Sequence, residues 1–118
     1  MKDFSALRLS LNFSAIQVTT ASLKALIALV PASMLFCGSV VLFLRERAVG
    51  SCLQLVGAAC LVVVALTHVF EALHWFPWMQ WGLEHSAGHY LDFWSAVLGL
   101  TLFPAGYLLH SLRSRARK

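Results

Sequence analysis

Three long stretches of the chain contain no Asp, Glu, Lys or Arg and consist mostly of apolar residues. They cover residues 25–44, 48–70 and 93–112. A helix rises about 1.5 Å per residue, so about 20 residues cross the roughly 30 Å hydrocarbon layer of a bilayer. The pattern therefore predicts three transmembrane helices, over about residues 25–44, 49–70 and 93–112.

The overall composition agrees with a membrane location. Hydrophobic residues make up 59% of the 118 residues, charged residues make up 12%, and the mean hydropathy is +0.76. Soluble domains carry roughly 25% charged residues, so a soluble fold is excluded. A chain of this length leaves no room for a second domain, and we expect an all-α, integral membrane three-helix bundle over residues 23–118.

The first 22 residues are less apolar and form a separate segment in this prediction. Two patterns overlap there. A helical stripe and a strand-like alternation both fit, the first through Phe4, Leu7, Leu11 and Val18, the second through Leu7, Leu9, Leu11 and Phe13. We favour the helix, and expect residues 1–22 to be an N-terminal amphipathic segment lying at the membrane interface.

The positive charges predict an orientation in the membrane. Six of the nine Lys and Arg residues follow the first or the third apolar stretch, and the other three are Lys2, Arg8 and Lys24. Cytoplasmic segments are enriched in Lys and Arg, so the first loop and the C-terminus are expected in the cytoplasm and the N-terminus outside. The net charge of +4 is then explained by topology, and no nucleic-acid partner is expected.

The segment from Glu71 to Asp92 contains no Lys or Arg and is rich in His, Trp and acidic residues. We expect it to form a periplasmic hairpin, because Pro77 should end the second helix and return the chain at the same depth. Helical spacing places three side chains on one face of each arm, namely His68, Glu71 and His74 before the turn and His85, His89 and Asp92 after it. Imidazole and carboxylate groups bind transition metals, and His also binds haem iron, so these six residues are candidate ligands of a metal, a haem or a pigment.

A simpler interpretation explains the same segment without a cofactor. Amphipathic aromatic rings gather at both surfaces of a bilayer. The members of such a belt here are Trp75, Trp78, Trp81, Tyr90 and Trp94. We favour this interpretation, in which no cofactor is bound. No nucleophile paired with a base and no phosphate-binding loop is recognisable, so we do not expect an enzyme.

Small residues within the apolar stretches indicate close helix packing. Gly57, Ser95 and Gly99 would let helix backbones approach each other, either within the bundle or against a partner helix. We therefore expect a membrane-protein partner or a homo-oligomer.

The C-terminal two thirds of the chain carries a resemblance. The run from His68 to His110, HVFEALHWFPWMQWGLEHSAGHYLDFWSAVLGLTLFPAGYLLH, resembles small bacterial inner-membrane proteins that have no assigned function. The resemblance implies a location in the bacterial inner membrane and supplies no catalytic residues. The leading hypothesis is a non-catalytic accessory subunit of a larger respiratory or photosynthetic membrane complex. The alternative is a metal-, haem- or pigment-binding membrane protein.

Overall fold

The chain folds into three long helices, as the apolar pattern predicts. The computed structural model describes residues 2–81 and 83–118, and within these residues it contains no strand. Helix α1 covers Lys2–Arg45, α2 covers Val49–Ala72 and α3 covers Ala87–Ala116, with a short 3-10 helix, η1, at Pro77–Met79. All three long helices are apolar enough and long enough to span a membrane. The prediction of an all-α, three-helix fold is confirmed.

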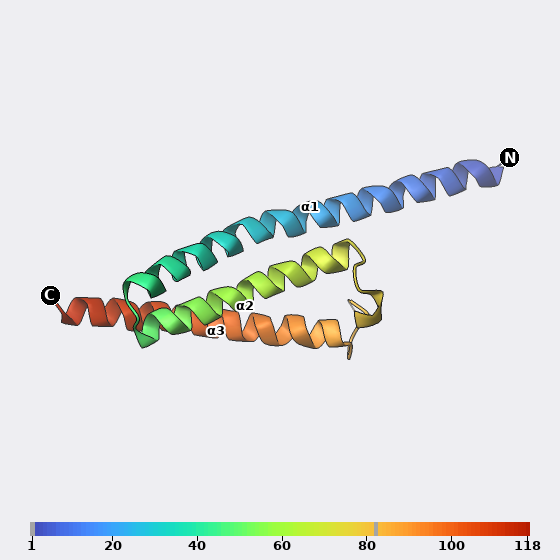
Figure 1. Ribbon diagram of the computed structural model, residues 1–118. Helices are drawn as coiled ribbons and strands as arrows, with labels where there is room; N and C mark the ends of the chain where they lie inside the picture. The colour runs from blue at the N-terminus through green and yellow to red at the C-terminus, as the bar shows by residue number, and fades with distance from the viewer. Residues whose placement is uncertain (1, 82) are drawn as a thin grey trace.

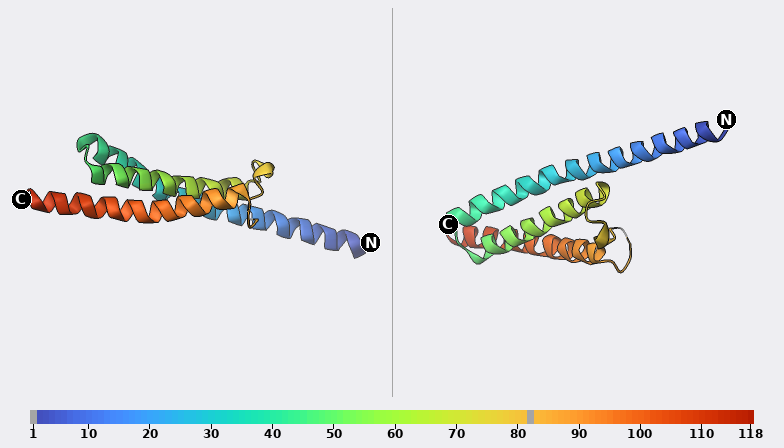
Figure 2. Two further views of the ribbon diagram at one scale, coloured as in Figure 1. Left: turned by 90° about the horizontal axis from the view of Figure 1, so that it is seen from below. Right: turned by 45° about the vertical axis from the view of Figure 1, so that its right-hand side comes forward.

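Helix α2 lies between the other two helices. Figure 1 shows α1 and α3 along opposite sides of α2, with consecutive helices running in opposite directions, and the side views agree (Figure 2). The main helix contacts are those of α1 with α2 and of α2 with α3. The loop between α2 and α3 is called here the aromatic hairpin turn (residues 73–86). It lies beside the N-terminal half of α1 (Figure 1).

Helix α1 is longer than a membrane crossing needs. Its 44 residues correspond to ~66 Å of helix, about twice the hydrocarbon thickness. The helix is continuous through residue 22, where the sequence suggested a boundary, and its first residues extend past the hairpin turn (Figure 1). The interfacial position of residues 1–22 stays a prediction.

The contact between α2 and α3 depends on glycines spaced seven residues apart in each helix. A Cβ atom added to Gly57 would lie 2.4 Å from the backbone nitrogen of Phe103, and one added to Gly106 would lie 2.4 Å from that of Gln54. A Cβ on Gly99 would lie 2.9 Å from the Leu61 side chain. The two backbones therefore approach too closely for any larger residue, which is how small residues stabilise helix pairs in membranes.

The remaining buried residues are also small. The buried apolar side chains of the described residues are all alanines, at Ala25 and Ala32 of α1 and at Ala58 and Ala65 of α2, while many Leu, Ile, Val and Phe side chains point outward. Ser95, predicted as a packing residue together with Gly57 and Gly99, is 9% exposed. A bundle with small residues inside and large apolar residues outside suits hydrocarbon as its surrounding medium.

Helix α2 ends earlier than Pro77 predicts. It ends at Ala72, because the chain turns back under an aromatic cluster in which Phe70 stacks on Trp75 with ring centroids 5.8 Å apart. Pro77 instead begins η1, and Phe76 before it has a positive φ of 55°. A residue that precedes proline avoids the helical conformation, so the turn starts before the proline is reached.

Candidate functional site

The last turn of α2 carries an ion pair between two of the predicted site residues. His68 and Glu71 are three positions apart in α2, so their side chains share one face of the helix. The distance between Nδ1 of His68 and Oε2 of Glu71 is 3.7 Å. Both side chains are about half exposed.

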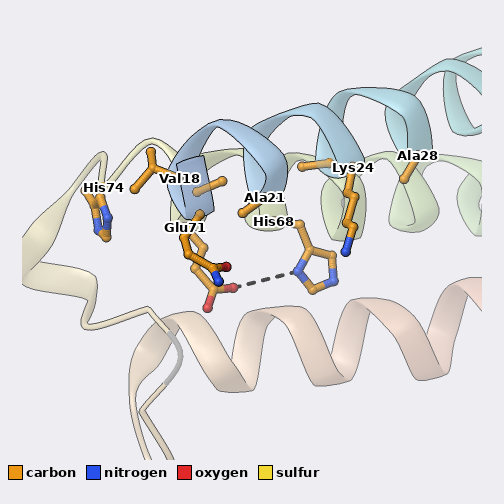
Figure 3. A pocket seen from close by; sticks show the side chains of 10 residues that line it. Val18, Ala21, Lys24, Ala28, His68, Glu71 and His74 are labelled. Carbon is orange, nitrogen blue, oxygen red and sulfur yellow. Dashed lines mark ion pairs between the residues drawn. The ribbon is translucent and has the colours of Figure 1, made fainter. Parts of the chain in front are cut away.

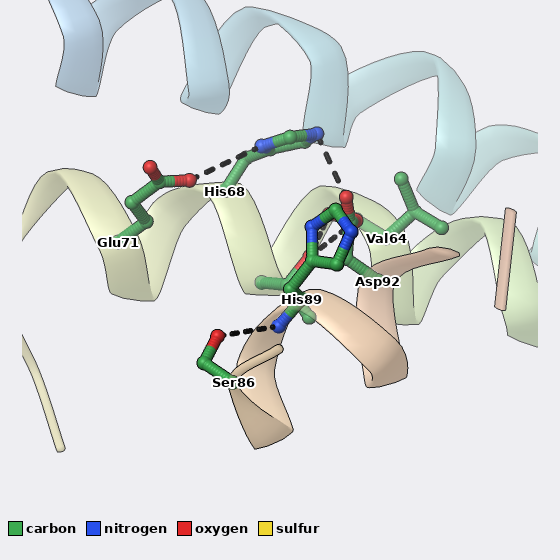
Figure 4. Close-up of polar contacts among 7 residues, drawn as sticks. Val64, His68, Glu71, Ser86, His89 and Asp92 are labelled. Atoms are coloured by element: carbon green, nitrogen blue, oxygen red, sulfur yellow. Dashed lines mark hydrogen bonds and ion pairs between the residues drawn. The ribbon is translucent and has the colours of Figure 1, made fainter. Parts of the chain in front are cut away.

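The same imidazole also faces α3. Its Nε2 atom lies 3.8 Å from Oδ1 of Asp92, which is in the second turn of α3 (Figure 4). His68 therefore lies between two carboxylates, one from its own helix and one from the neighbouring helix. This arrangement connects α2 to α3 at the hairpin end of the bundle.

Thr67 holds Asp92 in place and was not among the residues singled out from the sequence. Its Oγ1 atom lies 2.8 Å from Oδ1 of Asp92 and 2.7 Å from the carbonyl oxygen of Val64. Thr67 is 3% exposed, so the donor of this short hydrogen bond is buried, while the Asp92 side chain is 32% exposed. The only signal in the sequence is a hydroxyl residue within an apolar run, next to a His.

Two of the six predicted ligands lie outside the helices on which the prediction placed them. His74 follows the end of α2 with φ of 53°, and His85 precedes the start of α3 with φ of 66°. The expectation that each arm would display three residues on a continuous helical face is therefore wrong for these two. Nδ1 of His85 instead lies 3.2 Å from the hydroxyl oxygen of Tyr90.

His89 begins α3 close to the same region. Its backbone nitrogen donates a hydrogen bond to Oγ of Ser86, which is the N-cap of α3 (Figure 4). With Asp92, Glu71 and Thr67 it borders a cavity of about 60 Å³. The structure thus brings His68, Glu71 and Asp92 into contact and places His89 beside them. His74 lines a larger cavity together with His68 and Glu71, and His85 lies apart.

These residues do not fit a metal centre as they are arranged. In the part of the chain that the structure describes, no group of three or more His, Cys, Asp or Glu residues is placed to hold a metal ion. The two carboxylates approach opposite nitrogens of the His68 ring, at 3.7 and 3.8 Å. Bonds from zinc to His or carboxylate ligands are about 2.0–2.2 Å, and ligands must converge on one point.

The predicted aromatic belt has two kinds of members. Trp75, Trp78, Tyr90 and Trp94 are exposed, as amphipathic rings at a bilayer surface would be. Trp81 differs, because its indole nitrogen donates a hydrogen bond of 2.6 Å to the carbonyl oxygen of Trp75. Its ring also covers Gly88, where an added Cβ would lie 2.5 Å from it. Trp81 therefore holds the hairpin turn against α3.

A larger cavity of about 630 Å³ lies on the other side of His68, between α1 and α2. Lys24 from α1 and His68 from α2 extend into the same space, and alanines of α1 form part of its wall (Figure 3). This cavity could not be predicted from the sequence, because it depends on which face of α1 packs against α2.

A second His–carboxylate pair lies at the opposite end of the bundle. Nδ1 of His110 is 3.7 Å from Oε2 of Glu46, which links α3 to the connection between α1 and α2. The two ends of the bundle thus carry similar pairs, separated by the apolar spans.

Comparison with known proteins adds no identity to this geometry. No family model, curated protein or solved structure matches the chain. Its function is therefore argued from its own residues.

Proposed function

We propose that this chain is a non-catalytic accessory subunit that binds a larger membrane complex through the N-terminal part of α1. The observation that supports this proposal is a set of apolar side chains near the start of α1, each more than half exposed. They are Phe4, Leu7, Leu9, Leu11, Phe13 and Ile16. Burial of one such side chain contributes about 1.5–3 kcal/mol, so a partner that covers several of them would be held firmly.

The distribution of these side chains around the helix favours a protein partner in addition to lipid. At about 100° per residue, Phe4, Leu7 and Leu11 point to one side, and the others point to the opposite side. A bilayer surface can cover only one side of a helix that lies on it. In our proposal residues 1–22 lie at the interface, lipid covers the Phe4 side, and the complex covers the side of Leu9. Helix α1 then has to bend near residue 22.

We further propose that the protein belongs to the bacterial inner membrane, with the aromatic hairpin turn in the periplasm. The absence of Lys and Arg from that turn supports this orientation, as do Arg113 and Arg115 in the last turn of α3. The first loop and the C-terminus are then cytoplasmic. The accessory role requires no chemistry from the His68 region, whose polar groups connect α2 to α3.

Site-specific photo-cross-linking in cells tests the proposal. A photoreactive amino acid is placed at Leu9, and, as a control, at Leu109, which is exposed on α3. We expect a discrete protein adduct from position 9 that is absent from position 109. Polar substitution of Phe13 to Ser should weaken the adduct, because it removes apolar area from the same side of the helix.

Two results would contradict the accessory role. Lipid adducts alone at position 9 would mean that the bilayer covers the whole segment. An adduct of twice the mass of the chain would assign the surface to a homo-oligomer instead of a larger complex.

A further inference from the structure

The cavity between α1 and α2 has an apolar part and a polar part. Ala21, Ala25 and Ala28 form a wall of α1 along it, and small side chains there leave space where larger ones would fill it. Lys24, His68 and His74 supply hydrogen-bond donors to its lining. A volume of about 630 Å³ is within the roughly 300–1,000 Å³ range of small-molecule sites.

The lining of the cavity contains one cation, Lys24, and one carboxylate, Glu71. Both carboxylates near His68 face its ring nitrogens, and of the two only Glu71 also lines the cavity. Within the described part of the chain, Lys24 has no carboxylate within ion-pair distance. Its ammonium group, which Figure 3 shows beside the His68 ring, is therefore available to an anion.

The position of Lys24 along α1 matches the depth of lipid headgroups. It immediately precedes the uncharged stretch of residues 25–44, so its ammonium group lies at the boundary of the hydrocarbon layer. Ala25 and Ala28 follow it toward the middle of the membrane. The cavity thus presents a cation at the level of phosphate groups and an apolar wall at the level of acyl chains.

We propose that this cavity binds one anionic phospholipid. The phosphodiester contacts Lys24, and an acyl chain lies along Ala25 and Ala28. The bilayer itself supplies the ligand. The residues of α1 that hold this lipid begin at Lys24, after the bend proposed near residue 22. The site is therefore independent of the partner surface at the start of α1, and either proposal can fail without the other.

Native mass spectrometry of the full chain released from nanodiscs tests the site. The nanodiscs contain equal amounts of phosphatidylglycerol and phosphatidylcholine, which share acyl chains and differ in net charge. We expect the unmodified protein to retain one phosphatidylglycerol in preference to phosphatidylcholine. Lys24→Gln should reduce that preference about fivefold, the effect of one Lys at an anionic lipid surface. Arg117→Gln, which removes a charge at the opposite end of the bundle and outside the cavity, is the matched control.

A second pair of variants tests the apolar part. Ala28→Leu fills the cavity and should reduce retention of phosphatidylglycerol, whereas Ala105→Leu adds the same volume on the exposed side of α3 and should not. Circular dichroism of each variant verifies the helical fold. Equal retention of the two lipids by the unmodified protein would overturn the proposal. So would undiminished preference in Lys24→Gln, or equal effects of the two Leu variants.

Discussion

Replacing Gly57 by Ala should separate α2 from α3, and the structure gives the size of the effect. The added methyl would lie 2.4 Å from the backbone nitrogen and 2.8 Å from Cα of Phe103, whereas ordinary contacts begin at 3.4 Å. One helix must therefore move by about 1 Å, a gap that forfeits a quarter to a half of the dispersion attraction across the contact. Overpacking of this kind costs about 1–3 kcal/mol.

Gly38 in α1 offers a matched control for this substitution. It is also within a helix, but nothing lies within 4 Å of a Cβ added there. Both substitutions gain the same helix propensity, about 1 kcal/mol, because Ala restricts the unfolded backbone more than Gly does. The difference between the two variants therefore isolates the steric contribution at Gly57.

Titration from mild detergent micelles into SDS, followed by circular dichroism and tryptophan fluorescence, measures the free energy of unfolding. We expect Gly57→Ala to be less stable than Gly38→Ala by about 1–3 kcal/mol. Equal stability of the two variants would refute the close approach of α2 and α3 at this position.

Three further predictions concern the hairpin end of the bundle. Thr67→Val should lower the free energy of unfolding by about 1–3 kcal/mol, because Asp92 loses its short hydrogen bond, whereas Thr67→Ser should restore most of it. Gly88→Ala should displace the Trp81 ring, which the added Cβ would meet. In a variant whose other three Trp residues are replaced by Phe, this displacement should shift the indole fluorescence emission. Unchanged emission would contradict the contact. A cysteine introduced at Glu84 of a cysteine-free variant should react with an impermeant maleimide on intact cells, and reaction only after lysis would reverse the proposed orientation.

The helices could be predicted because hydrocarbon imposes a simple requirement on the backbone. Every peptide group within a bilayer needs an internal hydrogen bond, so a long uncharged stretch has to be helical. The stretches at 25–44, 49–70 and 93–112 accordingly lie within α1, α2 and α3. The ends of the helices were less predictable, because aromatic contacts around Phe70 and Trp75 end α2 before Pro77 is reached.

The candidate site was predictable only in part, for a related reason. Spacing along one helix placed His68 beside Glu71, and the return of the chain placed Asp92 at the same depth. The positive φ values of His74 and His85 depend on how the turn packs, which a helical pattern cannot express. Lys24 could not be associated with His68, because that proximity depends on the rotation of α1 against α2.

The position of α2 between α1 and α3 also determines the order in which the bundle can assemble during synthesis. Helix α1 leaves the ribosome before α2, its main packing partner, has been made. It is long and apolar enough to span a membrane, and its buried Ser39 hydroxyl donates to the carbonyl oxygen of Leu35 within the same helix at 2.8 Å. Helix α2 then packs against α1. Helix α3 is made last and packs against the glycines of α2. A nascent chain halted before α3 would therefore contain a paired α1 and α2 whose glycine face is open to lipid.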